Sequence, residues 1–391
     1  MTLDPLAWID EVAEARSRPN LQRSIVTHGA ATPGWIERDG RRLVDFCSND
    51  YLGLAGDPRV IAAGVDAARL YGWGAGASPL VSGWRGVHQA LAEELAAFEG
   101  TEAVAVFPSG YAANLGTIAS LVGSGDAVYG DRLNHSCLVQ GARLSGASLR
   151  VFPHRDHGRL ADLLERDRGR FRRTLIATDG VFSMDGYLAP IPELVAIAER
   201  FGAMLLVDEA HGTGVFGPEG RGASEALGVA GRVPIRVGTL SKAIGSVGGF
   251  VAGSRRLVDH LNNHAPTLVY STAMPPAAAG AAREALRIIR EEPWRRERVQ
   301  GLGRRLREGL RGIGLPVLES EGPIVPVILG EVDRTMDAAA RLLASGMLVA
   351  AIRPPTVPRG TARLRISLAA SHDERQVDRL IEALKAECPG I

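Results

Sequence analysis

The chain has 391 residues, of which 46% are hydrophobic and 23% are charged, the composition of a folded globular protein too long for one core of the usual size. Its 45 basic and 44 acidic residues give a net charge of +1, so no field for nucleic acid or for a membrane surface is implied. Cys47, Cys137 and Cys388 lack ligand spacing, which argues against disulfides and a zinc site and favours the cytoplasm.

The N-terminal part of the chain predicts surface structure. Residues 1–18 are amphipathic and acidic, which predicts a short surface helix and not a signal peptide. Residues 34–46 alternate apolar and polar side chains around Asp39-Gly40, a pattern that predicts a two-residue β-hairpin. The longest uncharged stretch, 265–282, contains three prolines and is rich in alanine, so it does not predict a membrane span.

Residues 46–282 alternate between strand and helix patterns. Five glycines make 72–86 a predicted loop, because so many glycines fit neither helix nor strand. The periodicity predicts strands at 104–107, 174–178 and 203–207, and helices at 87–98, 112–122 and 191–201. We therefore expect one large α/β domain with a mostly parallel central sheet between helices.

The C-terminal part, 283–391, predicts a smaller second α/β domain, and 1–45 a separate N-terminal segment. A helix at 283–291 and an arginine-rich run at 294–311 precede strands at 324–329 and 348–352 and helices at 335–345 and 373–386. Prolines predict an irregular loop over 353–365. Such a loop would leave Arg353, Arg363 and Arg365 available to bind a carboxylate through their guanidinium groups.

Polar residues follow successive predicted strands, at the sheet edge where open α/β sheets bind ligands. Ser109-Gly110-Tyr111 lies between a strand and a helix, so its backbone N–H groups could bind an anion. An ordinary turn with Ser109 as N-cap explains the same residues. His135 and Asp208-Glu-Ala-His211 occupy comparable positions, although a lone loop histidine is more often structural.

Lys242 is the most informative residue, because only it and Lys385 among the 45 basic residues are lysines. It lies among hydroxyls and glycines, in Thr239-Leu-Ser-Lys242. A desolvated amine can attack a carbonyl to form a Schiff base, which a guanidinium cannot do. An exposed loop lysine and a phosphate-binding lysine are the alternatives.

The Asp208-Glu-Ala-His211 sequence also resembles the DEAH box of a nucleotide-driven motor. That interpretation requires a phosphate loop ending in Gly-Lys-Ser/Thr, and neither lysine of this chain follows a glycine. A metal site built on Asp208, Glu209 and His211 matches no standard ligand spacing.

An aldehyde cofactor gives all of these residues complementary roles. Pyridoxal 5′-phosphate needs a lysine for its aldehyde, a carboxylate for its ring nitrogen, a donor to its phenolic oxygen, a stacked ring and a phosphate cradle. The candidates, in that order, are Lys242, Asp208, His211, His135 and the Ser109-Gly110-Tyr111 turn.

Seven motifs, in order along nearly the whole chain, resemble those of the α-oxoamine synthases, which are fold type I pyridoxal-phosphate enzymes. They are Ser48-Asn-Asp-Tyr-Leu-Gly-Leu54, Ser109-Gly-Tyr-Ala-Ala-Asn114, Asn134-His135, Asp179-Gly-Val-Phe-Ser-Met-Asp-Gly186, Asp208-Glu-Ala-His-Gly-Thr-Gly214, Thr239-Leu-Ser-Lys242 and Tyr270-Ser-Thr272. The chain departs from some relatives at Pro79, where they carry arginine, and at Asp179, where they carry glutamate. The resemblance implies the fold type I architecture and a homodimer with shared active sites.

The resemblance also implies roles for particular residues. Lys242 would bind pyridoxal phosphate covalently and move the α-proton, Asp208 would pair with the ring nitrogen, and His135 would stack on the ring. The ring oxygen would meet His211 and Ser183. The phosphate would contact Gly110, Tyr111 and Thr239, with Ser271 and Thr272 reaching over from a second subunit. Asn49 and Arg365 would hold the amino-acid carboxylate, and Arg23 and Thr356 the acyl substrate. An Asx turn explains Asn49 equally well.

Residues 351–365 most resemble members that condense L-alanine with a pimeloyl thioester, carried by CoA or by an acyl-carrier protein. An aminotransferase would share Lys242 and Asp208, but would convert the cofactor to its amine form with alanine alone. A regulatory pyridoxal-phosphate-binding module is disfavoured because no helix-turn-helix extension is evident.

Overall fold

The computed structural model describes residues 4–17 and 20–387, and these residues form two compact units. The large unit comprises residues 49–300, and the small unit combines the described residues up to 48 with those from 301 onward. The N-terminal residues thus group with the C-terminal ones. Residues 283–300, which we expected in the smaller domain, group with the large unit.

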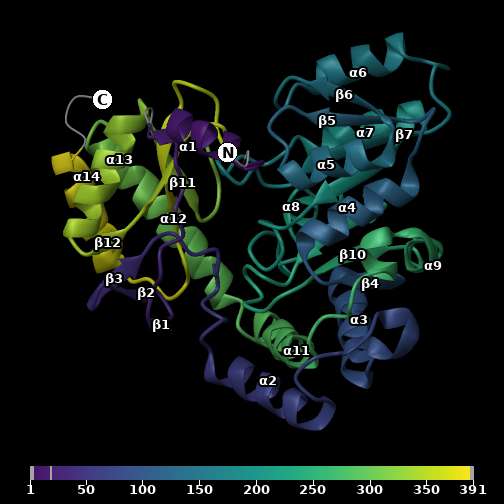
Figure 1. The fold of residues 1–391 in the computed structure, drawn as a ribbon, viewed down its shortest axis with the longest axis horizontal. Helices are drawn as coiled ribbons and strands as arrows, with labels where there is room; N and C mark the ends of the chain where they lie inside the picture. The colour runs from purple at the N-terminus through teal and green to yellow at the C-terminus, as the bar shows by residue number, and fades with distance from the viewer. Residues whose placement is uncertain (1–3, 18–19, 388–391) are drawn as a thin grey trace. The chain divides into compact units, whose positions relative to one another are not determined.

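A seven-stranded sheet forms the centre of the large unit (Figure 1). Its spatial order is β4 (Ala103–Phe107), β10 (Gly249–Gly253), β9 (Ile235–Thr239), β8 (Met204–Asp208), β7 (Thr174–Asp179), β5 (Ala127–Asp131) and β6 (Ser148–Phe152). The strands run parallel except β10, which is antiparallel to both neighbours. The predicted mostly parallel sheet is confirmed, and the carboxyl ends of six strands meet at one edge.

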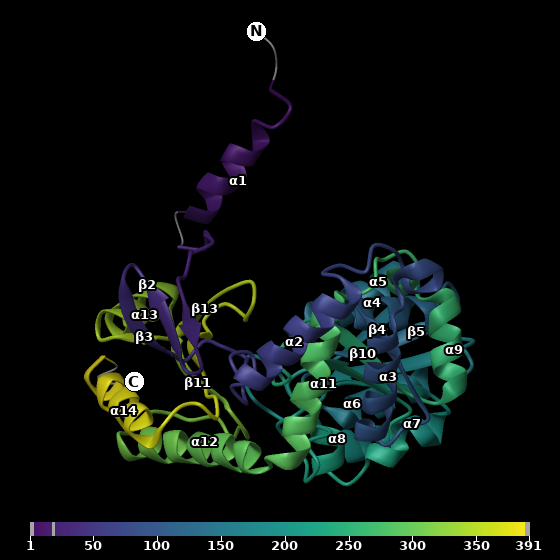
Figure 2. The same cartoon turned by 90° about the horizontal axis from the view of Figure 1, so that it is seen from below.

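Helices cover both faces of this sheet, as right-handed crossovers between parallel strands require. One face carries α4 (Gly110–Leu121), α5 (Ser136–Ser145), α9 (Arg255–His264) and α10 (Pro266–Val269). The other carries α3 (Gly86–Glu99), α6 (His157–Arg166), α7 (Ile191–Phe201) and α11 (Pro276–Glu291). Helix α2 (Pro58–Tyr71) packs along α11, as Figures 1 and 2 both show.

The α4/α5 face of the sheet holds a continuous apolar core that includes Ala177, Leu206 and Val237. Side chains alternate between the two faces along a strand. Asp179, Asp208 and Thr239 each lie two residues beyond those core residues, at the ends of β7, β8 and β9. The same face that is apolar in its middle therefore becomes polar at its carboxyl edge.

The small unit begins with α1 (Trp8–Ser17), in which no residue is buried, in line with the predicted surface helix. The predicted hairpin is confirmed as β2 (Trp35–Arg38) and β3 (Arg41–Asp45). Asp39 and Gly40 have φ values of 51° and 70°, the left-handed conformations of a type I′ turn. The sheet is completed by β1 (Ala31–Thr32) and β12 (Met347–Leu348).

A second sheet of the small unit corrects one expectation. Its order is β11 (Ile324–Gly330), β14 (Ala362–Ser367) and β13 (Ala350–Ile352), and the small unit also holds α13 (Val332–Ala344), α14 (Glu374–Glu387) and the part of α12 (Trp294–Gly312) after residue 300. The predicted loop over 353–365 is wrong beyond residue 361, because β14 is the central strand and alternates Arg363 and Arg365 with Ala362, Leu364 and Ile366. Both arginines are buried.

Short elements account for the other differences. The glycine-rich stretch 72–86 contains a single π-helical turn, η1 (Pro79–Gly83), and 265–282 forms α10 and the start of α11. Helix α8 (Ala223–Ala226) and the 3₁₀ turn η2 (Ala230–Arg232) precede β9. No helix in 4–17 or 20–387 is long and apolar enough to cross a membrane. Cys388 lies outside the described residues.

Candidate active site

A cavity of about 270 Å³ opens at the carboxyl edge of the large sheet. It brings together nine of the residues that the sequence singled out. The lining comprises Ser109, Gly110, Tyr111, Asn114, His135, Cys137, Asp179, Val181, Ser183, Asp208, Ala210, His211, Thr239, Ser241 and Lys242. These residues come from the carboxyl ends of five different strands and from the segments that follow them, so the sheet itself assembles the site.

The N-terminus of α4 forms one end of this cavity. The Ser109 hydroxyl caps the helix by accepting the Ala112 N–H at 3.1 Å. A Cβ on Gly110 would lie 3.1 Å from the Thr239 side chain, and a Cβ on Gly249 would lie 2.5 Å from the Gly110 nitrogen. Glycine at both positions lets the helix end approach β9 and β10. The unpaired N–H groups and the helix dipole favour an anion here.

Asp208 also lines the cavity and is only 5% exposed. Its Oδ2 accepts the Asn114 side-chain N–H at 2.7 Å, and its Oδ1 accepts the Ala210 backbone N–H at 2.9 Å. The Cys137 Sγ is 3.9 Å from Oδ2. These neutral donors leave lone pairs of the Asp208 carboxylate for a cationic ligand atom.

His135 caps α5 with its ring, since Nδ1 accepts the Cys137 N–H at 3.3 Å. Desolvation lowers the pKa of the His135 ring, against the opposing pull of Asp208 and with a further contribution from the charge of Lys242. The ring is therefore neutral near pH 7, and the backbone donor assigns its proton to Nε2. A neutral imidazole suits a stacking role.

Asp179 accepts the His135 backbone N–H at 3.1 Å and is paired with Asp208 in the β7–β8 ladder. Complete burial and the neighbouring Asp208 raise the pKa of Asp179 well above its ordinary value. Two adjacent buried carboxylates do not both ionise readily. Burial beside Asp208 therefore favours the protonated form of Asp179.

His211 follows Asp208 by three residues and is 8% exposed. Its Nδ1 is 2.7 Å from the hydroxyl of Tyr51, which also donates to the Asn49 Oδ1 at 3.1 Å. Tyr51 is fully buried. The loop after the hairpin is thereby linked to the cavity wall, through a tyrosine to which the sequence analysis gave no role of its own.

Lys242 lies in a closed loop between β9 and β10. The Ser246 N–H donates to the Leu240 carbonyl at 2.8 Å, and the Gly245 N–H donates to the Lys242 carbonyl at 2.8 Å. A Cβ on Gly245, which has φ of 70°, would lie 2.4 Å from the Ala55 nitrogen. The loop backbone is therefore fixed, and the half-buried Lys242 side chain enters the cavity from it.

Comparison with known proteins identifies the family to which the chain belongs. Residues 41–384 match the family model described as aminotransferase class I and II. The chain belongs to this family. The whole chain is 49% identical to the 8-amino-7-oxononanoate synthase of Anaeromyxobacter dehalogenans strain 2CP-1, and the match covers 98% of that relative. Over 90% of its length, the chain is 54% identical to the 8-amino-7-oxononanoate synthase of Halorhodospira halophila, and this match covers 87% of that relative.

A solved structure supports the same grouping for this aminotransferase-family chain. The serine palmitoyltransferase of Sphingomonas wittichii is 33% identical, has a TM-score of 0.93, and aligns over 98% of both chains. The resemblance to the α-oxoamine synthases and to the fold type I architecture is confirmed.

Glu209 has a structural role in this family member and does not line the cavity. Its carboxylate accepts the Ala223 and Ser224 backbone N–H groups and the Ser224 hydroxyl at 2.6–2.8 Å. Glycines 180, 212 and 222 leave room for it. The residues described hold no group of three or more histidines, cysteines or carboxylates that could bind a metal.

The remaining predicted site residues lie elsewhere. Ser271 and Thr272 line a separate small pocket beside Pro79 and Trp84. Within the small unit, Arg23 donates to the Thr356 hydroxyl at 2.9 Å. Arg365 lies on β14 and donates to the Ser367 hydroxyl at 2.7 Å. Arg23 and Thr356, both predicted to contact the acyl substrate, therefore lie next to each other.

Sequence reasoning gave no role to Asn114, which lines the cavity, or to Tyr51, which contacts the cavity residue His211. Both residues belong to the motifs at 48–54 and 109–114, but neither residue type indicates a role by itself. Asn114 lies four residues after Gly110 on a helix, a spacing that places both on one face. That spacing was the available signal.

Proposed function

We propose that the chain condenses L-alanine with a pimeloyl thioester, releasing CO₂ and the free thiol, to give 8-amino-7-oxononanoate, an intermediate of biotin biosynthesis. The observation that carries the proposal is the placement of Lys242, Asp208 and the α4 N-terminus around one cavity. Relatives named 8-amino-7-oxononanoate synthase are 49–54% identical to this chain.

The cavity fits pyridoxal 5′-phosphate. The glycine-lined end of α4 and Thr239 suit the phosphate, and the buried Asp208 suits the ring nitrogen. Lys242 supplies the amine for the aldehyde. When bound, the cofactor supplies a protonated ring that accepts electrons from the α-carbon of the amino acid.

The chain's own residues then have defined tasks. Asp208 keeps the ring nitrogen protonated, because an ionised carboxylate with fixed donors favours a nearby cation. The Lys242 amine, released when L-alanine binds, removes the α-proton and later returns a proton. His135 covers one face of the ring, and His211, held by Tyr51, and Ser183 contact its oxygen.

Substrate positions follow from the remaining assignments. Asn49 and Arg365 bind the carboxylate of L-alanine, and Arg23 and Thr356 bind the acyl group. Arg23 and Thr356 already hydrogen-bond to each other, so the contact site is prearranged. The thioester carrier is CoA or an acyl-carrier protein.

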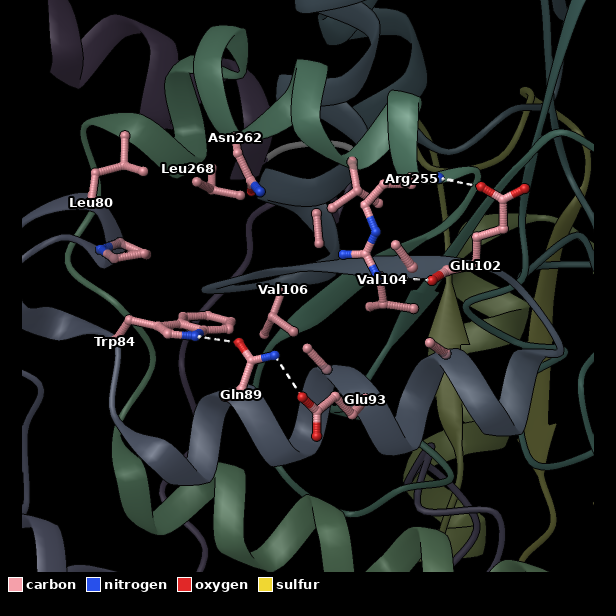
Figure 3. Close-up of a pocket in the computed structure, with 16 residues that line it drawn as sticks. Leu80, Trp84, Gln89, Glu93, Glu102, Val104, Val106, Arg255, Asn262 and Leu268 are labelled. Atoms are coloured by element: carbon pink, nitrogen blue, oxygen red, sulfur yellow. Dashed lines mark hydrogen bonds between the residues drawn. The ribbon is translucent and has the colours of Figure 1, made fainter.

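The active form is a homodimer in which Ser271 and Thr272 complete the phosphate site of the other subunit. Their pocket continues into a groove of about 430 Å³ along the edge strand β4, with Leu80 and Trp84 at one end and Arg255 and Glu102 at the other (Figure 3). Leu80, Val81 and Tyr270 are 55%, 80% and 87% exposed. Apolar side chains gathered in this way indicate a protein contact. We place the dimer in the cytoplasm, where Cys47 and Cys137 stay reduced.

The identity of the product tests the proposal. Purified protein loaded with pyridoxal phosphate is incubated with alanine, glycine or serine against pimeloyl, acetyl and palmitoyl thioesters, and the products are identified by mass. We expect the alanine–pimeloyl product to dominate. A dominant glycine–acetyl product would instead make the chain a glycine C-acetyltransferase. A dominant serine–palmitoyl product would make it a serine palmitoyltransferase, the activity for which its structural neighbour is named.

A further inference from the structure

Asn114 lies between the two ends of the cofactor cavity. It sits one turn into α4, four residues after Gly110, and is 1% exposed. Gly110 and Asp208 both line the cavity, and in the proposed function they hold the phosphate and the ring nitrogen of the cofactor. A single side chain therefore faces both groups that hold the cofactor.

The Asn114 amide nitrogen contacts both ends at once. Nδ2 donates to the Asp208 Oδ2 at 2.7 Å and to the Gly110 carbonyl at 3.2 Å. An amide nitrogen carries two N–H bonds and can serve both acceptors. The opposite orientation of the amide would turn its oxygen against two acceptors, so this assignment is fixed by its partners.

The Asn114 amide also lowers the stability of the fold, which indicates that it is retained for function. The Asn114 Oδ1 is buried and has no hydrogen-bond partner among the described residues. A buried polar atom without a partner destabilises the fold, and an apolar residue of similar shape would avoid this. Functional sites are where such costs persist.

We infer that Asn114 is a positioning residue: its amide fixes the Asp208 carboxylate toward the cofactor ring and couples that carboxylate to the phosphate-binding turn at Gly110. The inference rests on the proposed function only through the bound cofactor, not through the identity of the substrates. Loss of the amide leaves the Asp208 Oδ2 with the distant Cys137 thiol as its remaining donor among the contacts described. The carboxylate then holds the ring proton less firmly.

The test compares Asn114→Leu, Asn114→Asp and the control Thr117→Val with the wild-type holoenzyme. Thr117 lies three residues after Asn114 on α4 and is fully buried, and its hydroxyl has no partner among the described residues. Thr117→Val therefore changes the packing of the same helix without changing a contact of Asp208. The readouts are turnover, the dissociation constant of pyridoxal phosphate, and the pH midpoint of the visible absorption band.

We expect Asn114→Leu to lower kcat by roughly 10- to 100-fold, the effect of one hydrogen bond to a charged group. The pH midpoint of the absorption band in Asn114→Leu moves upward. A ring nitrogen that has lost its proton no longer repels the proton on the nitrogen of the Lys242 linkage, so that proton is lost only at higher pH. In Asn114→Asp the introduced carboxyl can donate only when protonated, so its activity relative to wild type rises as the pH falls. Thr117→Val keeps the wild-type midpoint.

Two results would overturn the inference: an unchanged midpoint and kcat in Asn114→Leu, or a pH-independent activity ratio in Asn114→Asp. Should Asn114→Leu fail to fold, the nearly isosteric Asn114→Asp decides alone. A chain that makes no condensation product but shows the midpoint shift would refute the proposed function and leave this inference standing.

Discussion

Lys242 and Lys385 are the two lysines of the chain, and their surroundings differ. Lys242 is half-buried in the cavity wall, and Lys385 is exposed on α14. Hydride reduction of the holoenzyme should therefore attach the cofactor to the peptide that contains Lys242. With a single competing lysine, peptide mapping gives an unambiguous assignment.

Replacement of Lys242 should remove both the linkage and the catalytic base. We expect Lys242→Ala to lose the visible absorption band and to lower turnover by orders of magnitude, because both covalent binding and proton transfer are lost. Lys385→Ala is the matched control and should keep full activity. Wild-type turnover in Lys242→Ala would contradict the assignment of this residue.

The residues found from sequence are those whose chemistry is rare. Lys242 stood out because nearly every other cation is arginine, and Asp208 because a carboxylate follows a buried strand. Tyr51 and Asn114 did not, because tyrosine and asparagine occur in many roles and their contacts join residues 160 and 94 positions apart. Only the fold brings such partners together.

At the scale of elements, the end of α3 contacts β9 through the buried side chains of Glu99 and Arg236. The Arg236 Nη1 is 3.6 Å from the Glu99 carboxylate, and its Nη2 donates to the Glu99 carbonyl at 2.7 Å. Glu209, Arg221 and Glu225 are the other charges near it. Burial raises the pKa of Glu99 to about 8, against the opposing effect of Arg236.

This pair predicts a pH-dependent stability. Between the ordinary glutamate pKa of 4.5 and about 8, folded Glu99 keeps a proton that the unfolded chain releases. Stability should therefore fall as the pH rises through this window, by up to about 1.4 kcal/mol per pH unit. Glu99→Gln mimics the protonated form, so it should match wild type near pH 5 and exceed it near pH 9.

Urea unfolding at several pH values measures this difference. The exposed Glu193 on α7 offers the control, since Glu193→Gln should leave the pH dependence as it is in wild type. Parallel stability curves for wild type and Glu99→Gln would show that the ion pair with Arg236 keeps Glu99 charged in the folded protein.

Elements were predictable where their periodicity was regular. Residues 191–201 form α7 at the predicted bounds, and the hairpin has its predicted turn. The strand β14 was missed because prolines precede it and alternating arginines suggested an exposed loop. Arginines buried in a central strand depend on partners supplied by the rest of the small unit, and these cannot be read locally.

For the whole molecule, Ser271 and Thr272 line a pocket separate from the Lys242 cavity, and the proposed homodimer gives them a role there. Both lie between α10 and α11, beside the exposed Tyr270. An interface made by one patch on both subunits would carry each pair of hydroxyls to the other cavity. In the proposed dimer, two complete sites would need two chains, and a monomer would lack part of its phosphate site.

Mixed dimers test this arrangement directly. One chain carries Lys242→Ala and the other Ser271→Ala with Thr272→Ala, and each homodimer has two defective sites. If the hydroxyls act across the interface, a mixed dimer has one site with both defects and one intact site, so random mixing should restore about a quarter of the wild-type activity. If the hydroxyls act within their own chain, no site in the mixed dimer is intact, and mixing restores nothing. Refolding the two variants together and assaying the mixture against each alone therefore separates an active site shared between subunits from one contained in a single chain.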